Sequence, residues 1–167
     1  MKKLILFFAL LIPTTLFGQR IEKNEYDRFE KYWIVKTKME KIASNDGDKI
    51  EICMRRSGES WQMLAFLHTT YSEKYDDGNG LSLLLDNDDV IRLVSVYTGV
   101  GYHFSTVYHL TKEDVEKLQN HNIIAIRSRY IDGHKDYDVP ENKQELIMNM
   151  INAIENEFYQ KTLLQNK

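Results

Sequence analysis

Five histidines are the first candidates for chemistry, because an imidazole nitrogen is a common metal ligand and can act as a general base near neutral pH. They are His68, His103, His109, His121 and His134. An even separation puts His103 and His109 on the same face of one strand, but about 20 Å apart, too far to bind one ion. The chain also lacks an HExxH motif and a paired CxxC motif. The sequence therefore predicts no metal site, and nothing in it implies a cofactor.

Three acidic clusters offer the oxygen ligands that a hard cation such as calcium prefers. They lie at residues 76–80, 86–89 and 132–138. None of them has the spacing of an EF-hand loop. Because Asp, Asn and Gly also turn the chain most readily, we interpret the clusters as turns, with a cation site as the alternative.

A catalytic nucleophile is not evident. The segment nearest to the Gly-x-Ser-x-Gly elbow of serine hydrolases is residues 56–60, which lacks the pattern and is typical of a hairpin turn. Cys53 is the only cysteine and has no Cys-His signature around it. We expect it to be a small buried side chain without an intramolecular disulfide. A pair of carboxylates working as acid and base stays open among the 25 acidic residues, but we predict no particular catalytic residue.

Arginines give the only candidate ligand-binding residues. Arg127 and Arg129 alternate with apolar residues, so they are predicted to lie on the outward face of a strand, as is Arg55 on an earlier strand. An outward pair such as Arg127 and Arg129 beside a tyrosine-rich sheet is suited to hold a carboxylate or a sulfate. The alternative is that these arginines are solvated or paired with nearby acids.

The N-terminus predicts export. Lys2 and Lys3 precede an apolar run over residues 4–12, which has the length of a secretory signal but is too short to span a bilayer. Pro13 ends the run, and cleavage after Gly18 would leave residues 19–167. We therefore predict a signal peptide at residues 1–18 and one domain at residues 19–167, with a retained membrane anchor as the alternative. After cleavage we expect no stable membrane span, and a periplasmic or secreted location.

Charge argues against a polyanionic partner. The whole chain has 22 basic and 25 acidic residues, a formal charge of −3. Loss of Lys2 and Lys3 with the signal peptide makes it −5. A net negative charge repels nucleic acid, so we expect no nucleic-acid partner.

Periodicity predicts an α+β fold. We expect an antiparallel β-meander sheet, a short helix between the late strands, and a C-terminal amphipathic helix packed on one face of the sheet. A first helix is expected at residues 21–33. Strands are expected at residues 33–39, 50–54, 61–71, 81–85, 90–97, 102–110, 123–131 and 137–139, with a loop at 72–80.

The two later helices have clear signals. Thr111 is a good N-cap, and Val115 and Leu118 form an apolar stripe after it. Pro140 suits the first turn of the last helix. That helix should bury a stripe recurring at three and four residues, made by Leu146, Ile147, Met150, Ile151, Ile154 and Phe158.

A run of residues in the second half resembles a family of uncharacterised small exported proteins of Bacteroidetes-type bacteria. Their pattern is Y-x-L-T-x-E-x-L-x-x-L, then I-x-x-I-R, then a D-G turn and a final amphipathic helix. The matching residues here are Tyr108, Leu110, Thr111, Glu113, Val115, Leu118, Ile123, Ile126, Arg127, Asp132 and Gly133. Val115 stands where Leu is usual. The resemblance covers residues 81–158, and it implies the architecture but no catalytic or binding residue.

Two functions fit these sequence features. We expect an exported soluble module that binds a ligand or a partner, because a small exported α+β domain needs no catalytic signature for that role. The alternative is a periplasmic hydrolase acting on cell-envelope material. A pocket with a nucleophile, a base and oxyanion donors would favour the enzyme, and an open groove without them would favour binding.

Overall fold

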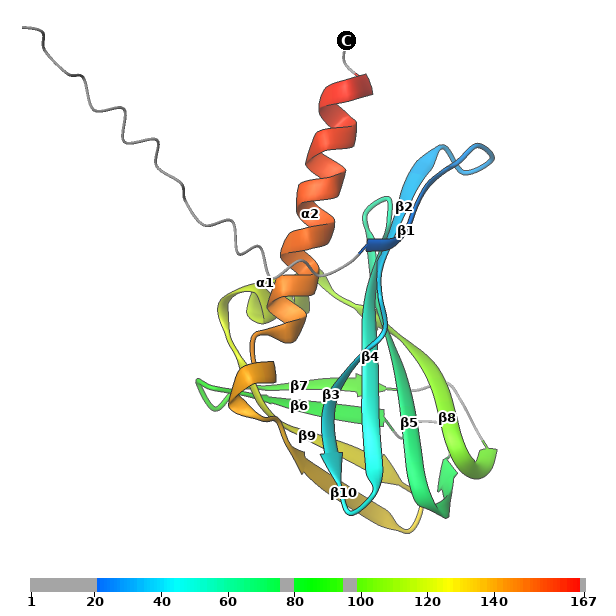
Figure 1. Cartoon of the computed structure of the whole chain (residues 1–167), viewed down its shortest axis with the longest axis vertical. Coiled ribbons are helices and arrows are strands. Elements are labelled where there is room, and N and C mark those ends of the chain that lie inside the picture. The colour runs from blue at the N-terminus through cyan, green and yellow to red at the C-terminus, as the bar shows by residue number, and fades with distance from the viewer. Residues whose placement is uncertain (1–20, 76–79, 95–98, 166–167) are drawn as a thin grey trace, which may run out of the picture.

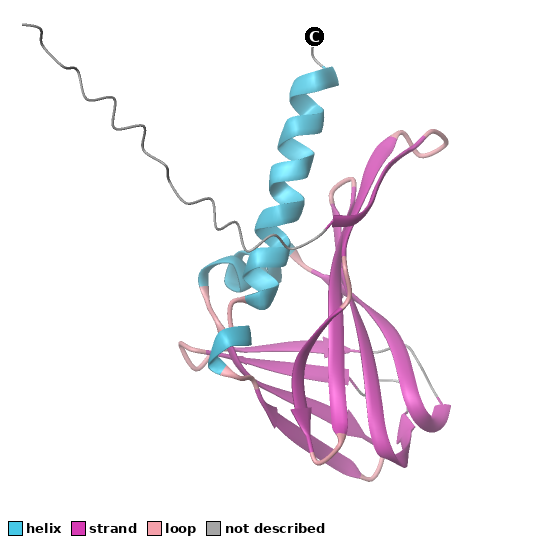
Figure 2. Ribbon diagram, in the orientation of Figure 1, coloured by secondary structure: helices cyan, strands magenta, loops and turns pink. Residues whose placement is uncertain are grey.

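Antiparallel strands and two α-helices make up the fold, shown in Figures 1 and 2. The structure is a computed structural model, and it describes residues 21–75, 80–94 and 99–165. In chain order the elements are β1 (Ile21–Asp27), β2 (Tyr32–Thr37), β3 (Glu40–Asn45), β4 (Asp48–Ser57), β5 (Ser60–Tyr75), β6 (Gly80–Leu85), β7 (Val90–Val94), β8 (Gly99–Leu110), α1 (Lys112–Asn120), β9 (Ile123–Tyr130), β10 (Gly133–Asp138), the 3-10 helix η1 (Glu141–Lys143) and α2 (Leu146–Gln165).

The strands form two antiparallel sheets that face each other. The six-stranded sheet has the order β1-β2-β4-β5-β8, with β3 also paired to β4, and the four-stranded sheet has the order β10-β9-β6-β7. The predicted α+β class, with antiparallel strands, a short helix and a C-terminal helix on the sheet, is confirmed. The sequence predicts a single meander sheet, in which strands pair in chain order, whereas here β8 pairs with β5 and β9 with β6.

The predicted first helix over residues 21–33 is wrong. Residues there form β1, a turn and the start of β2. Asp27 makes the turn, because its carboxylate accepts hydrogen bonds from the backbone N–H groups of Phe29 and Glu30. Lys31 has a φ of 59°, and the Phe29 side chain is 95% exposed. The apolar residues of this segment therefore do not share a buried face, which a helix would require.

The predicted hairpin around residues 44–48 exists, in the form of β3 and β4. Asp46 and Gly47 have φ values of 48° and 86°, as the twist of a two-residue hairpin turn requires. The strand expected at residues 33–39 corresponds to β2, which ends earlier, at Thr37. The hairpin partner of β4 is the separate strand β3, and both β2 and β3 pair with β4. The hairpins expected at residues 56–59 and 86–89 are also present, between β4 and β5 and between β6 and β7.

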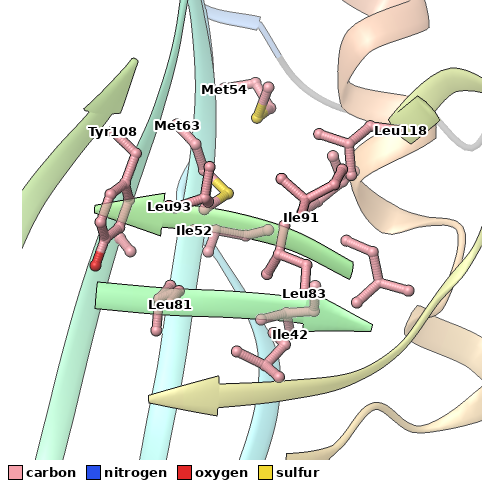
Figure 3. Close-up of a cluster of buried hydrophobic side chains, with 14 of the residues drawn as sticks. Ile42, Ile52, Met54, Met63, Leu81, Leu83, Ile91, Leu93, Tyr108 and Leu118 are labelled. Carbon is pink, nitrogen blue, oxygen red and sulfur yellow. The ribbon is translucent and has the colours of Figure 1, made fainter. Parts of the chain in front are cut away.

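One hydrophobic core fills the space between the sheets and continues under the helices. On β5 the alternation predicted from sequence holds, with Trp61, Met63, Ala65 and Leu67 buried. Figure 3 shows side chains of the two sheets meeting there, among them Ile52 and Met63 from one sheet and Leu81, Leu83 and Ile91 from the other.

Helix α1 begins as predicted at Thr111. The Thr111 hydroxyl accepts a hydrogen bond from the backbone N–H of Asp114, and the Asp114 carboxylate accepts one from the backbone N–H of Thr111. This reciprocal capping box satisfies two N–H groups that the first helical turn leaves free. Val115 and Leu118 are buried, as expected.

Helix α2 packs on the six-stranded sheet at β2 and β4, next to α1, as Figure 1 shows. Leu146, Ile147, Met150, Ile151 and Ile154 are buried, and Phe158 is partly buried against the same core. Pro140 does not begin this helix, as had been expected, but precedes η1. An ion pair of 2.6 Å from Arg56 to Glu155 joins β4 to α2.

The late strands differ from the prediction in register and length. On β9, Ile126 and Tyr130 are buried as expected, but Ile123 takes the buried place given to Ile124. The pairing with β6 shifts by one residue at this point, so the alternation is broken. Strand β10 begins at Gly133, earlier than expected. Of the predicted loop at residues 72–80, residues 72–75 belong to β5 and Gly80 begins β6. Residues 76–79 of that loop lie outside the described residues, as do residues 95–98 at the end of the strand predicted at 90–97.

Candidate functional site

A row of polar side chains crosses the outer face of the four-stranded sheet. Arg92 on β7 lies opposite Ser82 on β6, Ser82 lies opposite Arg127 on β9, and Arg127 lies opposite Asp136 on β10. Residues directly opposite each other on neighbouring strands project from the same face. Two arginines therefore flank a small serine on this outer face.

The next row along the same face is largely apolar. Val90, Leu84, Ala125 and Asp138 lie opposite one another in the same way across the four strands. Together the two rows line a hollow of about 320 Å³, which we call the arginine groove. Its lining residues are Ser82, Leu84, Val90, Arg92, Ala125, Ile126, Arg127, Arg129, Asp136 and Asp138.

The charge of Arg127 is already compensated. Its Nε and one terminal nitrogen donate hydrogen bonds of 2.6 and 2.7 Å to the two carboxylate oxygens of Asp136. The hydrogen bond with Asp136 raises the pKa of Arg127, and the same bond lowers the pKa of Asp136. Both side chains are about half exposed, so the pair contributes little to stability. Its main effect is to hold the Arg127 guanidinium at the rim of the groove.

Arg92 and Arg129 differ from Arg127 in their surroundings. Both are exposed, and neither forms an ion pair or a hydrogen bond within the described residues. Arg129 lies one step beyond the Leu81–Ser128 pair, which places it opposite Gly80, a residue without a side chain. Gly80 and Ser82 thus leave space on β6 between Arg92 on β7 and Arg129 on β9. Neighbouring strands are about 4.8 Å apart, so an anionic group over β6 is within reach of arginines on both sides.

A cluster between the two sheets fixes the strand that carries Asp136. Lys135 on β10 donates to Asp48 on β4 at 2.9 Å and pairs with Glu73 on β5 at 2.8 Å. Asp48 is only 3% exposed, and it also accepts hydrogen bonds from the Thr70 backbone N–H and hydroxyl. We call Asp48, Lys135 and Glu73 the intersheet clamp. Because it ties β10 to the other sheet, it also fixes Asp136 and, through it, Arg127.

The clamp shifts the pKa of Asp48 and of Lys135. Burial alone would raise the pKa of Asp48, but the hydrogen bonds from Lys135 and Thr70 outweigh burial and lower it. Burial would likewise lower the pKa of Lys135, but the carboxylates of Glu73 and Asp48 outweigh it and raise the pKa strongly. Both groups are therefore charged at neutral pH.

The arginines predicted from the sequence lie on two different sheets. Arg127 and Arg129 lie outward on β9, as the sequence indicated, and both line the groove. Arg55 is separated from them, because β4 belongs to the other sheet. Arg92 was not predicted from the sequence. Its alternation with buried Ile91 and Leu93 was a usable signal for an outward side chain, but its place beside β9 depends on β6 pairing with both strands.

The other candidates behave largely as structural residues. At the 86–89 turn, Asp86 accepts hydrogen bonds from the His121 ring and the Asn122 backbone, and Asn87 accepts one from the backbone of Asp89. In the described part of the chain, no three His, Cys, Asp or Glu side chains are grouped so as to hold a metal ion. Cys53 is fully buried, and burial raises the pKa of its thiol, which disfavours a reactive thiolate.

No protein family, no curated protein and no solved structure matches this chain. Among the described residues, no helix is both long and apolar enough to cross a membrane.

Proposed function

We propose that this protein is an exported soluble binding module, and that the arginine groove binds a ligand with an anionic group. The observation that carries the proposal is a pair of cations, Arg92 and Arg129, on either side of the small residues Ser82 and Gly80, with no ion-pair partner among the described residues. Guanidinium groups bind carboxylate, sulfate or phosphate through paired hydrogen bonds. The row of Val90, Leu84 and Ala125 beside them favours a ligand whose anionic group is attached to an apolar part.

The alternative function, a hydrolase acting on cell-envelope material, would need a nucleophile beside a base. Ser82, the hydroxyl in the groove, forms no hydrogen bond with a histidine in the described structure, and the Cys53 thiol is buried. An open groove with cations and an apolar floor supports binding better than catalysis.

The binding proposal is tested by nuclear magnetic resonance on ¹⁵N-labelled protein titrated with sulfate, phosphate and alkanoates from acetate to octanoate. We expect chemical-shift changes concentrated on β6, β7 and β9, with affinity rising with alkanoate chain length. Arg92→Gln and Arg129→Gln should each weaken binding about tenfold or more, because each removes a charge-assisted contact. Arg127→Gln should weaken it less, since Asp136 already compensates Arg127.

Arg28→Gln is the matched control, because Arg28 lies in the exposed turn between β1 and β2, on the other sheet. It should bind like the parent protein. Equal effects of Arg28→Gln and Arg92→Gln would contradict the proposal, as would shift changes that avoid β6, β7 and β9.

Export is proposed on the basis of residues 1–18, which lie outside the described residues. We expect the native protein to begin at Gln19 and to be found in the periplasm or the medium. Intact-mass measurement of the fractionated native protein tests this. A species that still begins at Met1 and sediments with the membrane would refute the soluble-export proposal.

A further inference from the structure

Two histidines face each other on the outer side of the six-stranded sheet. His68 on β5 lies directly opposite His103 on β8, and these strands are neighbours in Figure 1. Their Nδ1 atoms are 3.0 Å apart, and their rings meet edge to face at a centroid distance of 4.9 Å. The sequence indicates only that His103 and His109 share one face of a strand. The histidine that lies next to His103 in space is His68, on the neighbouring strand.

A carboxylate fixes which nitrogen of His68 carries its proton. The Nε2 atom of His68 lies 3.0 Å from the Glu51 carboxylate, and Lys49 donates to the other oxygen of that carboxylate at 3.2 Å. An ionised carboxylate only accepts hydrogen bonds, so Nε2 of a neutral His68 must carry the proton. Its Nδ1 atom then presents a lone pair toward His103.

This arrangement matches both parts of a metal site, the ligand atoms and the groups that orient them. A metal-binding histidine typically donates its other ring N–H to a carboxylate, which fixes the tautomer and increases the basicity of the ligand nitrogen. Two imidazole nitrogens bound to one zinc or copper ion at about 2.0 to 2.1 Å lie about 2.9 to 3.4 Å apart, depending on the angle at the metal. The observed separation of 3.0 Å lies within that range.

We propose that His68 and His103 form a surface site for a divalent transition metal ion, with zinc as the representative ion. The two Nδ1 atoms are the protein ligands, Glu51 orients His68, and water completes the coordination. His103 is exposed and the His68 side chain is 24% exposed, so an ion has access to both rings. The site is built from two protein ligands, which agrees with the absence of any cluster of three in the described residues.

The backbone beside the pair supports a fixed geometry. The pairing of β5 with β8 shifts register between His68 and Glu73, immediately after the histidines. Thr69 stabilises this irregularity, because its hydroxyl donates to the carbonyl oxygen of Tyr71 at 2.7 Å and lies 3.3 Å from that of Tyr102. On the other side, the Phe66 ring packs against the His68 ring.

Calorimetric titration of the untagged protein with zinc chloride at neutral pH tests the proposal. We expect one ion per chain. His68→Ala and His103→Ala should each weaken binding at least tenfold. Glu51→Gln should weaken it about tenfold to a hundredfold without removing either ligand, as the loss of an orienting carboxylate does in known metal sites. Histidine resonances in the nuclear magnetic resonance spectrum should show metal attachment at Nδ1 of both residues.

His109→Ala is the matched control, because His109 is exposed on the same face of β8 but six residues away. It should bind zinc as the parent does. Equal weakening by His109→Ala and His103→Ala would overturn the proposal, because binding would then be nonspecific. An absence of saturable binding would also overturn it, and would leave the pair as a hydrogen bond between two imidazole rings. Neither result affects the arginine groove, which lies on the other sheet.

Discussion

The inner face of the six-stranded sheet is covered in two different ways. Near the ends of β2 and β4 that adjoin α2, the cover is the helix with its apolar stripe. Toward the other end of β4 and β5, the cover is the four-stranded sheet (Figure 1), with the intersheet clamp at its margin. The helix contributes a stripe of side chains close together in sequence. The sheet contributes side chains from strands far apart in sequence, together with a partly buried ion cluster.

The two covers stabilise the fold through different interactions. The helix cover depends on apolar burial, which changes little with pH. The sheet cover adds charged groups that are partly removed from water, and the buried Asp48 carboxylate stabilises the fold only while it stays paired. The two covers should therefore respond differently to substitution and to acid.

The largest effect is expected at the helix cover. Ile151→Asp places a carboxylate at a fully buried position without a partner, and it should lower the free energy of unfolding by more than about 4 kcal/mol. Asn149→Asp, at a part-exposed position in the same helix, should change it by less than about 0.5 kcal/mol. Urea denaturation of both variants measures this. Equal small shifts would show that α2 does not stabilise the sheet.

A smaller effect is expected at the intersheet clamp. Asp48→Asn removes the charge that faces Lys135 and weakens the hydrogen bonds from Thr70, and should cost about 2 kcal/mol. The matched control is Asp46→Asn in the same turn, because Asp46 is exposed and asparagine tolerates its positive φ. Thermal unfolding of the two variants should rank them clearly, and a control as unstable as Asp48→Asn would assign the effect to the turn instead of the clamp.

The two covers should also differ in how their stability depends on pH. The pKa of Asp48 is lowered by folding, so its stabilising effect is present above the unfolded value near 4 and is lost as the pH falls through the lower folded value. The pKa of Lys135 is raised, so its contribution is present below the unfolded value near 10 and is lost only above that. The stability difference between the parent and Asp48→Asn should be largest between about pH 5 and 9 and should shrink in acid. A constant difference from pH 7 to pH 3 would contradict this assignment.

The smallest effect is expected at Cys53, which belongs to neither cover. It is buried but lies outside the main hydrophobic core, and it points to the opposite side of β4 from Ile52 and Met54. Cys53→Ala should cost no more than about 1 to 2 kcal/mol and leave ligand binding unchanged. Denaturant midpoints and the alkanoate titration check both statements, and a loss of binding in this variant would assign Cys53 to the site.

Local signals explain which elements were predictable. The α2 stripe, the Thr111 cap and the Asp46-Gly47 turn each depend on residues within a few positions of one another, and all were identified from sequence. The first segment differs from the prediction because its spacings of three to five residues indicate a helix, whereas the Asp27 side chain stabilises a turn within it. The division into two sheets depends on nonlocal pairing, which periodicity does not contain.

The sites follow the same rule. The outward direction of Arg127 and Arg129 came from alternation along one strand, which is local. Arg92 joins them only because β6 lies between β7 and β9, and His68 meets His103 only because β5 lies beside β8. In both cases the residue types were visible in the sequence, but their partners were set by the order of strands in the sheets.

The position of β1 at the end of the six-stranded sheet has a consequence for behaviour at high concentration. A terminal strand leaves one row of backbone N–H and C=O groups free to pair with another molecule, which is a common start of aggregation. Here that strand carries charged residues, with Lys23 paired to Glu25 and Glu22 to Lys36. Pairing two such strands edge to edge would take these charged side chains partly out of water, which is unfavourable. The border of the sheet thus discourages chains from joining edge to edge, although its backbone is open to do so.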